Sequence, residues 1–317
     1  NKTFHNNEYA WYGYGSFLFK MWVQTSIAHN MVVVDKRMQK PSPCKCIYYV
    51  ADKKVFRDTR SKEDLFSAVC AQTVTEWIDP PYGGQTPYPF LFPEEKCKKE
   101  GRYILTPEKV RKQGEIGEYS EPVFSRRLLV LFHGYCIVWD FLAGKKEHCY
   151  DCLYHPMGRF DNEDKIVFVK KARFSDDPFG AGQFIRNCYT AKIEKTACLR
   201  FHGAPARVNP NDIMDFTPES AVFLAWPKSC DITIGRYPQR KDQFTDKELE
   251  TTAEFLKEPL KKTVSFTTEG KKAEFITILE AGESSQALDY EIMDMEDYVT
   301  NQSGVENLQI VRDVMAT

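Results

Sequence analysis

A histidine and an asparagine stand immediately ahead of a short apolar run near the start of the chain. The segment reads Ala28-His29-Asn30-Met31-Val32-Val33-Val34-Asp35. A run of β-branched residues favours a buried strand, and a rigid strand can fix the direction of the polar groups before it. His29 can bind a metal or exchange a proton, and Asn30 can donate to a carboxylate. A histidine here can also be a half-buried side chain satisfied by a backbone carbonyl.

Other candidate groups lie elsewhere along the chain. Tyr14, within Trp11-Tyr12-Gly13-Tyr14-Gly15, can act as an acid or base if cations lower its pKa, or can simply pack in an aromatic loop. Arg126 and Arg127 straddle the start of a predicted strand, so their side chains should point to opposite faces. His148 and His155 flank Tyr150 and Asp151, a set that favours a packing network over catalysis.

The elements that must position these groups are mostly strands. A hairpin is predicted from Arg127 to Phe132 and from Tyr135 to Trp139, turning at His133-Gly134. Other strands are predicted at Met31–Val34, Lys165–Val169, Cys188–Ile193, Ala221–Trp226 and Glu274–Leu279, short helices at Thr245–Leu256 and Ser61–Ala68, and a loop from Asp79 to Pro93. Many short strands without alternating helices predict a large antiparallel β-sandwich, and residues 1–317 are expected to form one domain.

Composition narrows the class of protein. The 43 Lys and Arg nearly balance the 45 Asp and Glu, which argues against general nucleic-acid binding. No apolar run is long enough to span a bilayer. Among the ten cysteines, the pairs Cys44/Cys46 and Cys149/Cys152 suggest zinc, but no second Cys-x-x-Cys completes a ribbon. We therefore expect structural or free thiols, and the redox compartment stays open.

The first of these segments resembles the heparinase II/III-like polysaccharide lyases, which include alginate and heparin lyases. The matching residues, in order and spacing, are Tyr14-Gly15, Trp22, Ser26, Ala28-His29-Asn30, Val32-Val33-Val34-Asp35 and Gln39. The chain departs from the family pattern at Val23, Gln24, Met31 and Lys36, and the family has Gly at the last of these. Weaker matches follow at Arg126-Arg127-Leu128 to Trp139-Asp140 and at His148 to His155, beyond which the resemblance ends.

The resemblance implies β-elimination on a polysaccharide that contains uronic acid. A base removes the proton beside the uronate carboxylate, and this requires cations or hydrogen-bond donors that neutralise the carboxylate. Tyr14 matches a catalytic tyrosine, and Asn30 would bind the acidic sugar. Of the pair Arg126 and Arg127, one would bind the sugar and the other would face solvent. His29 matches a ligand of a structural zinc whose other ligands lie upstream in the family, so the zinc site would be incomplete within this chain.

The resemblance also implies partners and a location. The chain would be the β-sandwich that follows an N-terminal helical toroid domain, and by itself it is expected to lack lyase activity. A periplasmic or secreted location is expected from the family, although no signal segment is visible. Two alternatives stay open: a non-catalytic carbohydrate-binding or scaffold sandwich, and a uronate epimerase that shares the proton abstraction. Nucleic acid is not expected as a partner, and no membrane-spanning segment is expected.

Overall fold

The fold was analysed in a computed structural model of the chain. The structure describes residues 22–23, 25–56, 63–78, 120–132, 135–156, 158–162, 165–176, 180–202, 218–238 and 261–283. Within these ranges no helix is long and apolar enough to cross a membrane.

The described residues form antiparallel strands and two short 3-10 helices, Ser26–Ala28 and Ala181–Phe184. The strands are β1 Val32–Val34, β2 Met38–Gln39, β3 Lys45–Phe56, β4 Glu63–Thr75, β5 Trp77–Ile78, β6 Val123–Phe132, β7 Tyr135–Tyr154, β8 Arg159–Asp161, β9 Val169–Arg173, β10 Arg186–Ile193, β11 Ala197–His202, β12 Pro218–Trp226, β13 Cys230–Arg236 and β14 Lys262–Glu283. The architecture is thus all-β, as predicted.

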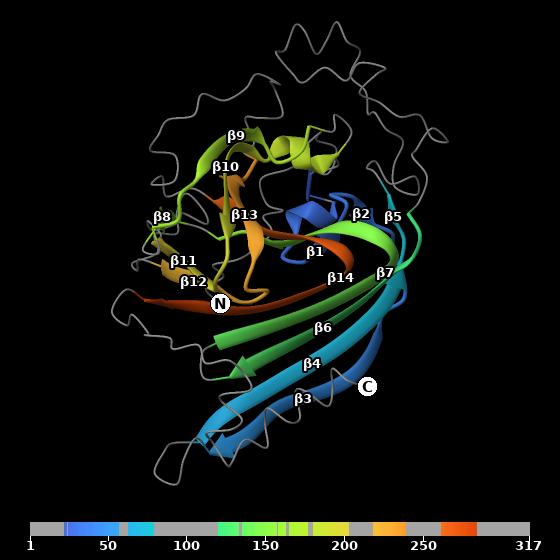
Figure 1. Ribbon diagram of the computed structural model, residues 1–317. Helices are drawn as coiled ribbons and strands as arrows, with labels where there is room; N and C mark the ends of the chain where they lie inside the picture. Colours follow the sequence, from blue (N-terminus) through green and yellow to red (C-terminus); the bar gives the residue numbers. More distant parts are fainter. Residues whose placement is uncertain are drawn as a thin grey trace, which may run out of the picture.

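Two long strands, β7 and β14, run through both layers of the molecule (Figure 1). In the first layer, the N-terminal half of β7 and the C-terminal half of β14 pair side by side in a sheet of order β3-β4-β6-β7-β14-β12-β11-β8. In their other halves, β7 pairs with β1 and β14 pairs with β13, and the sheet continues from β13 to β10 and then to β9. We call these the lower and the upper layer, after their positions in Figure 1. The sandwich is therefore one continuous sheet folded over itself, with β2 and β5 forming a separate small pair.

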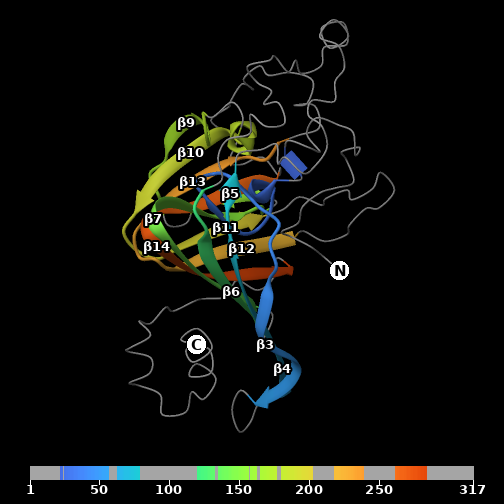
Figure 2. The ribbon, with the colours of Figure 1, turned by 90° about the vertical axis from the view of Figure 1, so that its right-hand side faces the viewer.

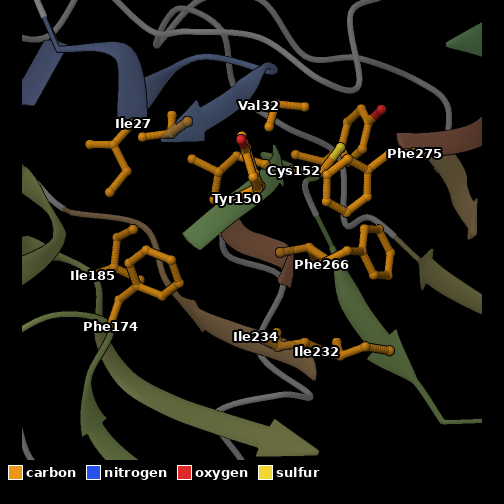
Figure 3. Packing of buried hydrophobic residues seen from close by; sticks show 14 of the residues in the cluster. Ile27, Val32, Tyr150, Cys152, Phe174, Ile185, Ile232, Ile234, Phe266 and Phe275 are labelled. Carbon is orange, nitrogen blue, oxygen red and sulfur yellow. The ribbon is translucent and has the colours of Figure 1, made fainter. Parts of the chain in front are cut away.

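The main core lies between the layers and continues over the upper one. Phe275 and Leu199 of the lower layer belong to the same buried cluster as Phe266 and Ile234 of the upper layer. Figure 3 shows Ile27, Phe174 and Ile185 in this cluster, contributed by segments outside the long strands. A smaller cluster covers the outer face of the lower layer, around Ala68, Cys70, Leu128 and Val130. In Figure 2 β3 and β4 extend past the rest of the sheet.

The predicted strands agree with the structure in most places. The hairpin is β6 and β7, and the segments predicted at Met31–Val34, Cys188–Ile193, Ala221–Trp226 and Glu274–Leu279 lie largely or wholly within β1, β10, β12 and β14. The helix predicted at Thr245–Leu256 and the loop from Asp79 to Pro93 lie outside the described residues.

Two predicted elements are wrong. Most of the helix predicted at Ser61–Ala68 falls in β4, where Phe66 pairs with Phe132 and Ala68 with Val130; pairing with a neighbouring strand overrides a weak local helix preference. The strand predicted at Lys165–Val169 begins only at Val169. Ahead of it, the Asn162 side chain bonds both backbone groups of Ile166, and Lys165 has φ of 51°. This local turn prevents strand pairing there.

Candidate functional site

Hydrogen bonds fix the chain both before and after the His29-Asn30 turn. The Thr25 hydroxyl donates to the Trp22 carbonyl at 2.7 Å, and the Ser26 hydroxyl accepts from the Gln39 amide at 2.7 Å. After the turn, the Leu153 amide donates to the Met31 carbonyl at 3.0 Å, which brings the chain onto the edge of β7. The backbone that carries the two predicted site residues is therefore held by bonds to three different segments.

Arg127 is the cation that meets this turn. Its guanidinium donates to both carboxylate oxygens of Asp140, from Nε at 2.6 Å and from Nη2 at 2.9 Å. The remaining Nη1 donates to the Asn30 carbonyl at 2.7 Å. Arg127 and Asp140 are directly opposite on β6 and β7, so the sheet register itself creates the pair. Burial works against the charged guanidinium, but Asp140 outweighs it and raises the pKa of Arg127, which stays ionised.

Asn30 also meets the end of β7. Its side-chain oxygen accepts from the His155 amide at 3.0 Å. The His155 ring is fully buried, lies 3.2 Å from the Thr263 hydroxyl through Nδ1, and packs edge-on against Trp22 and Tyr237. Because Oδ1 accepts this bond, the amide nitrogen of Asn30 is the end of the side chain that can donate to a ligand.

His29 is half-buried and bonds back to the segment before it. Burial lowers the pKa of His29, and a hydrogen bond to the Val23 backbone partly opposes that effect. The ring is therefore neutral at pH 7, the form that can bind a metal or accept a proton.

A second anchor follows at the turn after β1. The Arg37 amide donates to the Val34 carbonyl at 3.0 Å, while Asp35 and Lys36 have φ of 53° and 57°. Two consecutive residues with positive φ define a type I′ turn, where Asn, Asp and Gly are preferred. Asp35 fits because its carboxylate bonds Nδ1 of His148 at 2.7 Å and accepts the Cys149 amide at 2.9 Å.

Lys36 occupies the other strained position and reaches a buried carboxylate. Its ammonium lies 3.1 Å from Oδ2 of Asp151 and 3.4 Å from Sγ of Cys149. Asp151 is fully buried and also accepts from Thr267 at 2.7 Å and from Ser265 at 3.2 Å. Desolvation lowers the pKa of Lys36, but the charge of Asp151 outweighs this and the pKa is raised. Burial raises the pKa of Cys149 to about 11, so that thiol is protonated.

The predicted site residues fall into three groups. Asn30 and Arg127 are in direct contact, with His29 beside them. Arg126 points to the other face, where its guanidinium donates to Oε1 of Gln72 at 2.8 Å and lies over the Phe124 ring. The opposite orientation of the two arginines is as predicted, whereas Arg127 lies on the inner face with a carboxylate. Tyr14 lies outside the described residues.

Two important residues were not singled out from the sequence, Lys36 and Asp151. The only signal for Lys36 was its departure from the family glycine, at a position that the structure places in left-handed backbone. Asp151 was mentioned as a member of a packing set, and its ion pair with Lys36 spans 115 positions, which no local pattern reveals.

The described part of the chain holds no complete metal centre. No group of three or more His, Cys, Asp or Glu side chains within the described ranges lies close enough to bind an ion. His29 thus offers a single ligand there. The nine described cysteines are all free thiols.

Comparisons with known proteins give little beyond this geometry. Neither a protein-family model nor a curated protein matches the sequence. Among solved structures, the heparan sulfate lyase HepC from Pedobacter heparinus matches 84% of this chain with a TM-score of 0.27 and 10% identity. The match spans 26% of the length of that lyase. No functional conclusion follows from a likeness at this level.

Proposed function

We propose that this chain is the β-sandwich part of an enzyme that cleaves uronic-acid polysaccharides by β-elimination. One observation carries the proposal: three stretches that separately resemble the lyase family meet in one place. Asn30 from the first, Arg127 and Asp140 from the second and His155 from the third are joined by hydrogen bonds of 2.6 to 3.0 Å.

The chemistry assigns a different task to each group. The elimination requires donors that face the uronate carboxylate, so that the neighbouring proton becomes acidic. The amide nitrogen of Asn30 is such a donor, and Tyr14 is assigned by resemblance as the acid or base. Arg127 is already bonded to Asp140 and to the Asn30 carbonyl. We assign it the task of positioning Asn30 instead of binding sugar.

Zinc belongs to the same proposal. A neutral His29 can serve as one ligand, and the remaining ligands would come from segments other than the described ones, since zinc takes about four. Zinc would hold the His29-Asn30 turn to whatever segment supplies those ligands. The chain's own residues supply the fixed backbone on either side of that turn.

A scaffold without catalysis is the second candidate. It is favoured by the structural engagement of the motif residues: Arg127 with Asp140, Asn30 with His155, and Asp35 with His148. A motif that only fixes the N-terminal segment to β7 would produce the same contacts. The two candidates differ in whether any bond of the polysaccharide is broken.

The test is the ultraviolet absorbance of unsaturated uronate, with heparan sulfate and alginate as substrates. The natural full-length protein that contains this chain should produce the signal with one of them. Tyr14→Phe should abolish it and Asn30→Ala should lower it strongly, with melting temperatures close to wild type for Tyr14→Phe. An unchanged rate in Tyr14→Phe, or no unsaturated product from the full-length protein, would leave the scaffold candidate.

A further inference from the structure

Two copies of the same short motif face each other where the sheet folds over. Gly144-Lys145-Lys146 lies within β7, and Gly270-Lys271-Lys272 lies within β14, where the pairing of the two strands shifts register. The register runs from Gly270 opposite His148 directly to Lys272 opposite Ala143, so residues 144–147 bulge opposite Lys271. Four lysines from stretches more than a hundred positions apart thereby gather at one bend.

Two glycines and one buried tyrosine fix the backbone of the bend. A Cβ on Gly144 would lie 2.7 Å from the His148 ring, and Gly270 has φ of 147°, so both positions require glycine. The buried Tyr150 lies beneath the bend, where its hydroxyl donates to the Lys271 carbonyl at 3.3 Å. Tyr150 also hydrogen-bonds to the Gly144 backbone. One buried side chain thus fixes both motifs.

The lysines form an exposed basic patch. Lys145, Lys146, Lys271 and Lys272 are all exposed, and the acids next to them in sequence are Glu147 and Glu269. These four ammonium groups lie in a molecule whose net charge is −2. Other nearby carboxylates already have partners: Asp35 and Glu121 lie against the His148 ring, and Glu274 accepts a hydrogen bond from Trp139. The bend therefore presents four exposed cations close together, which suits a ligand with closely spaced anionic groups.

An aromatic surface adjoins the patch on the outer face of the lower layer. Phe124 lies opposite Ala143, which lies opposite Lys272, so these three share a face. Phe141 packs edge-on against Phe124, and the Arg126 guanidinium lies 5.5 Å from the Phe124 ring centre. Strands two apart are separated by roughly 10 Å, about two sugar units. Rings beside cations can contact sugar faces while the cations meet acidic groups.

We propose that this bend is a binding site for an acidic polysaccharide, with Lys145, Lys146, Lys271 and Lys272 meeting its carboxylate or sulfate groups. The inference rests on the proposed function and adds a site on the outside of the sandwich, on the face opposite to Arg127. Nucleic acid is disfavoured because the positive charge is confined to a small patch of a nearly neutral molecule.

The test measures binding by the chain itself. The variant Lys145→Gln/Lys146→Gln/Lys271→Gln/Lys272→Gln removes the patch without touching either glycine. Lys165→Gln/Lys170→Gln is the matched control, because both lysines are exposed and lie near the edge strand β9. Calorimetry uses heparan sulfate oligosaccharides, alginate oligosaccharides, neutral dextran and single-stranded DNA. Far-ultraviolet circular dichroism and melting curves confirm that each variant folds.

The quadruple variant should bind the acidic oligosaccharides about tenfold more weakly or worse, since four exposed ionic contacts are lost. The control should bind within about twofold of wild type, and higher salt should reduce the difference. Binding of heparan sulfate without alginate would assign the site to sulfate, and binding of both would assign it to carboxylate. Equal binding by wild type and quadruple variant, or DNA binding as tight as polysaccharide binding, would overturn the proposal. If the wild type binds through the lysines while the full-length protein makes no unsaturated uronate, then the proposed lyase function fails and this site stands.

Discussion

Each half of β7 buries one aspartate, and the two aspartates are neutralised in different ways. Asp140, in the lower layer, receives both of its strongest bonds from one guanidinium, that of Arg127. Asp151, in the upper layer, receives the ammonium of Lys36 and two hydroxyls, from Ser265 and Thr267. Both cations also hold the N-terminal segment: Arg127 bonds the carbonyl of Asn30, and Lys36 belongs to that segment itself.

The two aspartates of β7 therefore differ in how much each depends on a single partner for its neutralisation. A planar guanidinium satisfies a carboxylate in a bidentate pair, so its loss removes everything at once. A carboxylate shared by several donors, as Asp151 is by Lys36, two hydroxyls and the Cys149 thiol, keeps the others when one is lost. Loss of the ion pair between Arg127 and Asp140 should therefore lower the free energy of unfolding more than loss of the pair between Lys36 and Asp151, although Asp140 is no more buried than Asp151.

The largest expected effect is that of Arg127→Met. It leaves the buried Asp140 without its cation and should lower the free energy of unfolding by about 3 kcal/mol. Urea unfolding followed by circular dichroism measures the change. In the double variant Arg127→Met/Asp140→Leu the carboxylate is gone too, so much of the loss should return. A single variant as stable as wild type would show that the pair is not a stabilising anchor.

Lys36→Met should cost less, about 1 to 2 kcal/mol, because Ser265 and Thr267 still bond Asp151. The pKa of Lys36 is raised, so its contribution is fully present below the ordinary lysine pKa of 10.5 and is lost as pH rises through the folded-state value. The difference between wild type and Lys36→Met should therefore stay constant from neutral to mildly alkaline pH and shrink only above pH 10.5. Urea unfolding over that range tests the sign; a difference that grows with alkalinity contradicts it.

Lys36→Gly separates the two features of this position. It removes the ion pair as Met does, but glycine adopts φ of 57° without strain, so it should be about 1 kcal/mol more stable than Lys36→Met. Parallel melting curves of the two variants make the comparison. Equal stability would mean that the turn stores no strain at this residue.

The smallest expected effect is that of His29→Ala in this chain, about 1 kcal/mol for one half-buried hydrogen bond. The lowered pKa of His29 means that the folded state disfavours the charged ring, so the cost of the substitution should shrink as pH falls below 6.5. Urea unfolding at neutral and acidic pH measures it. In the natural full-length protein the same variant should also lose zinc, as metal analysis would detect; unchanged zinc content there contradicts the proposed ligand role.

Much of the fold followed from the sequence because strand patterns are local. The hairpin of β6 and β7 was predicted from a two-residue turn between apolar runs. Strand lengths were not, since β7 and β14 continue through their glycines. Gly144 and Gly270 look like strand ends in sequence, and only the register between the two strands shows that they form a shared bend.

Only part of the candidate site could be predicted from the sequence, because Lys36 and Asp151 were not singled out and Arg126 lies on the other face. The motif singled out Asn30 and Arg127, which meet although they are 97 positions apart. Which of the two arginines faces inward depends on the carboxylate opposite it, Asp140, and on the layer that covers that face. Neither fact is present in the local sequence. Arg126 and Arg127 are therefore equivalent until the sheet is assembled.

At the bend where the sheet folds over, β7 and β14 contribute unequal numbers of residues. Four residues of β7, 144–147, cover the curve that Lys271 alone covers on β14. The strand with more residues at the bend follows the longer path. The number of residues in 144–147 should therefore affect how sharply one layer turns over the other. A deletion there would change the angle at which the layers meet, whereas a deletion within 135–143 would turn every following side chain to the wrong face. The same strand thus contains a stretch whose length affects how the layers meet and another whose length sets which face each side chain occupies.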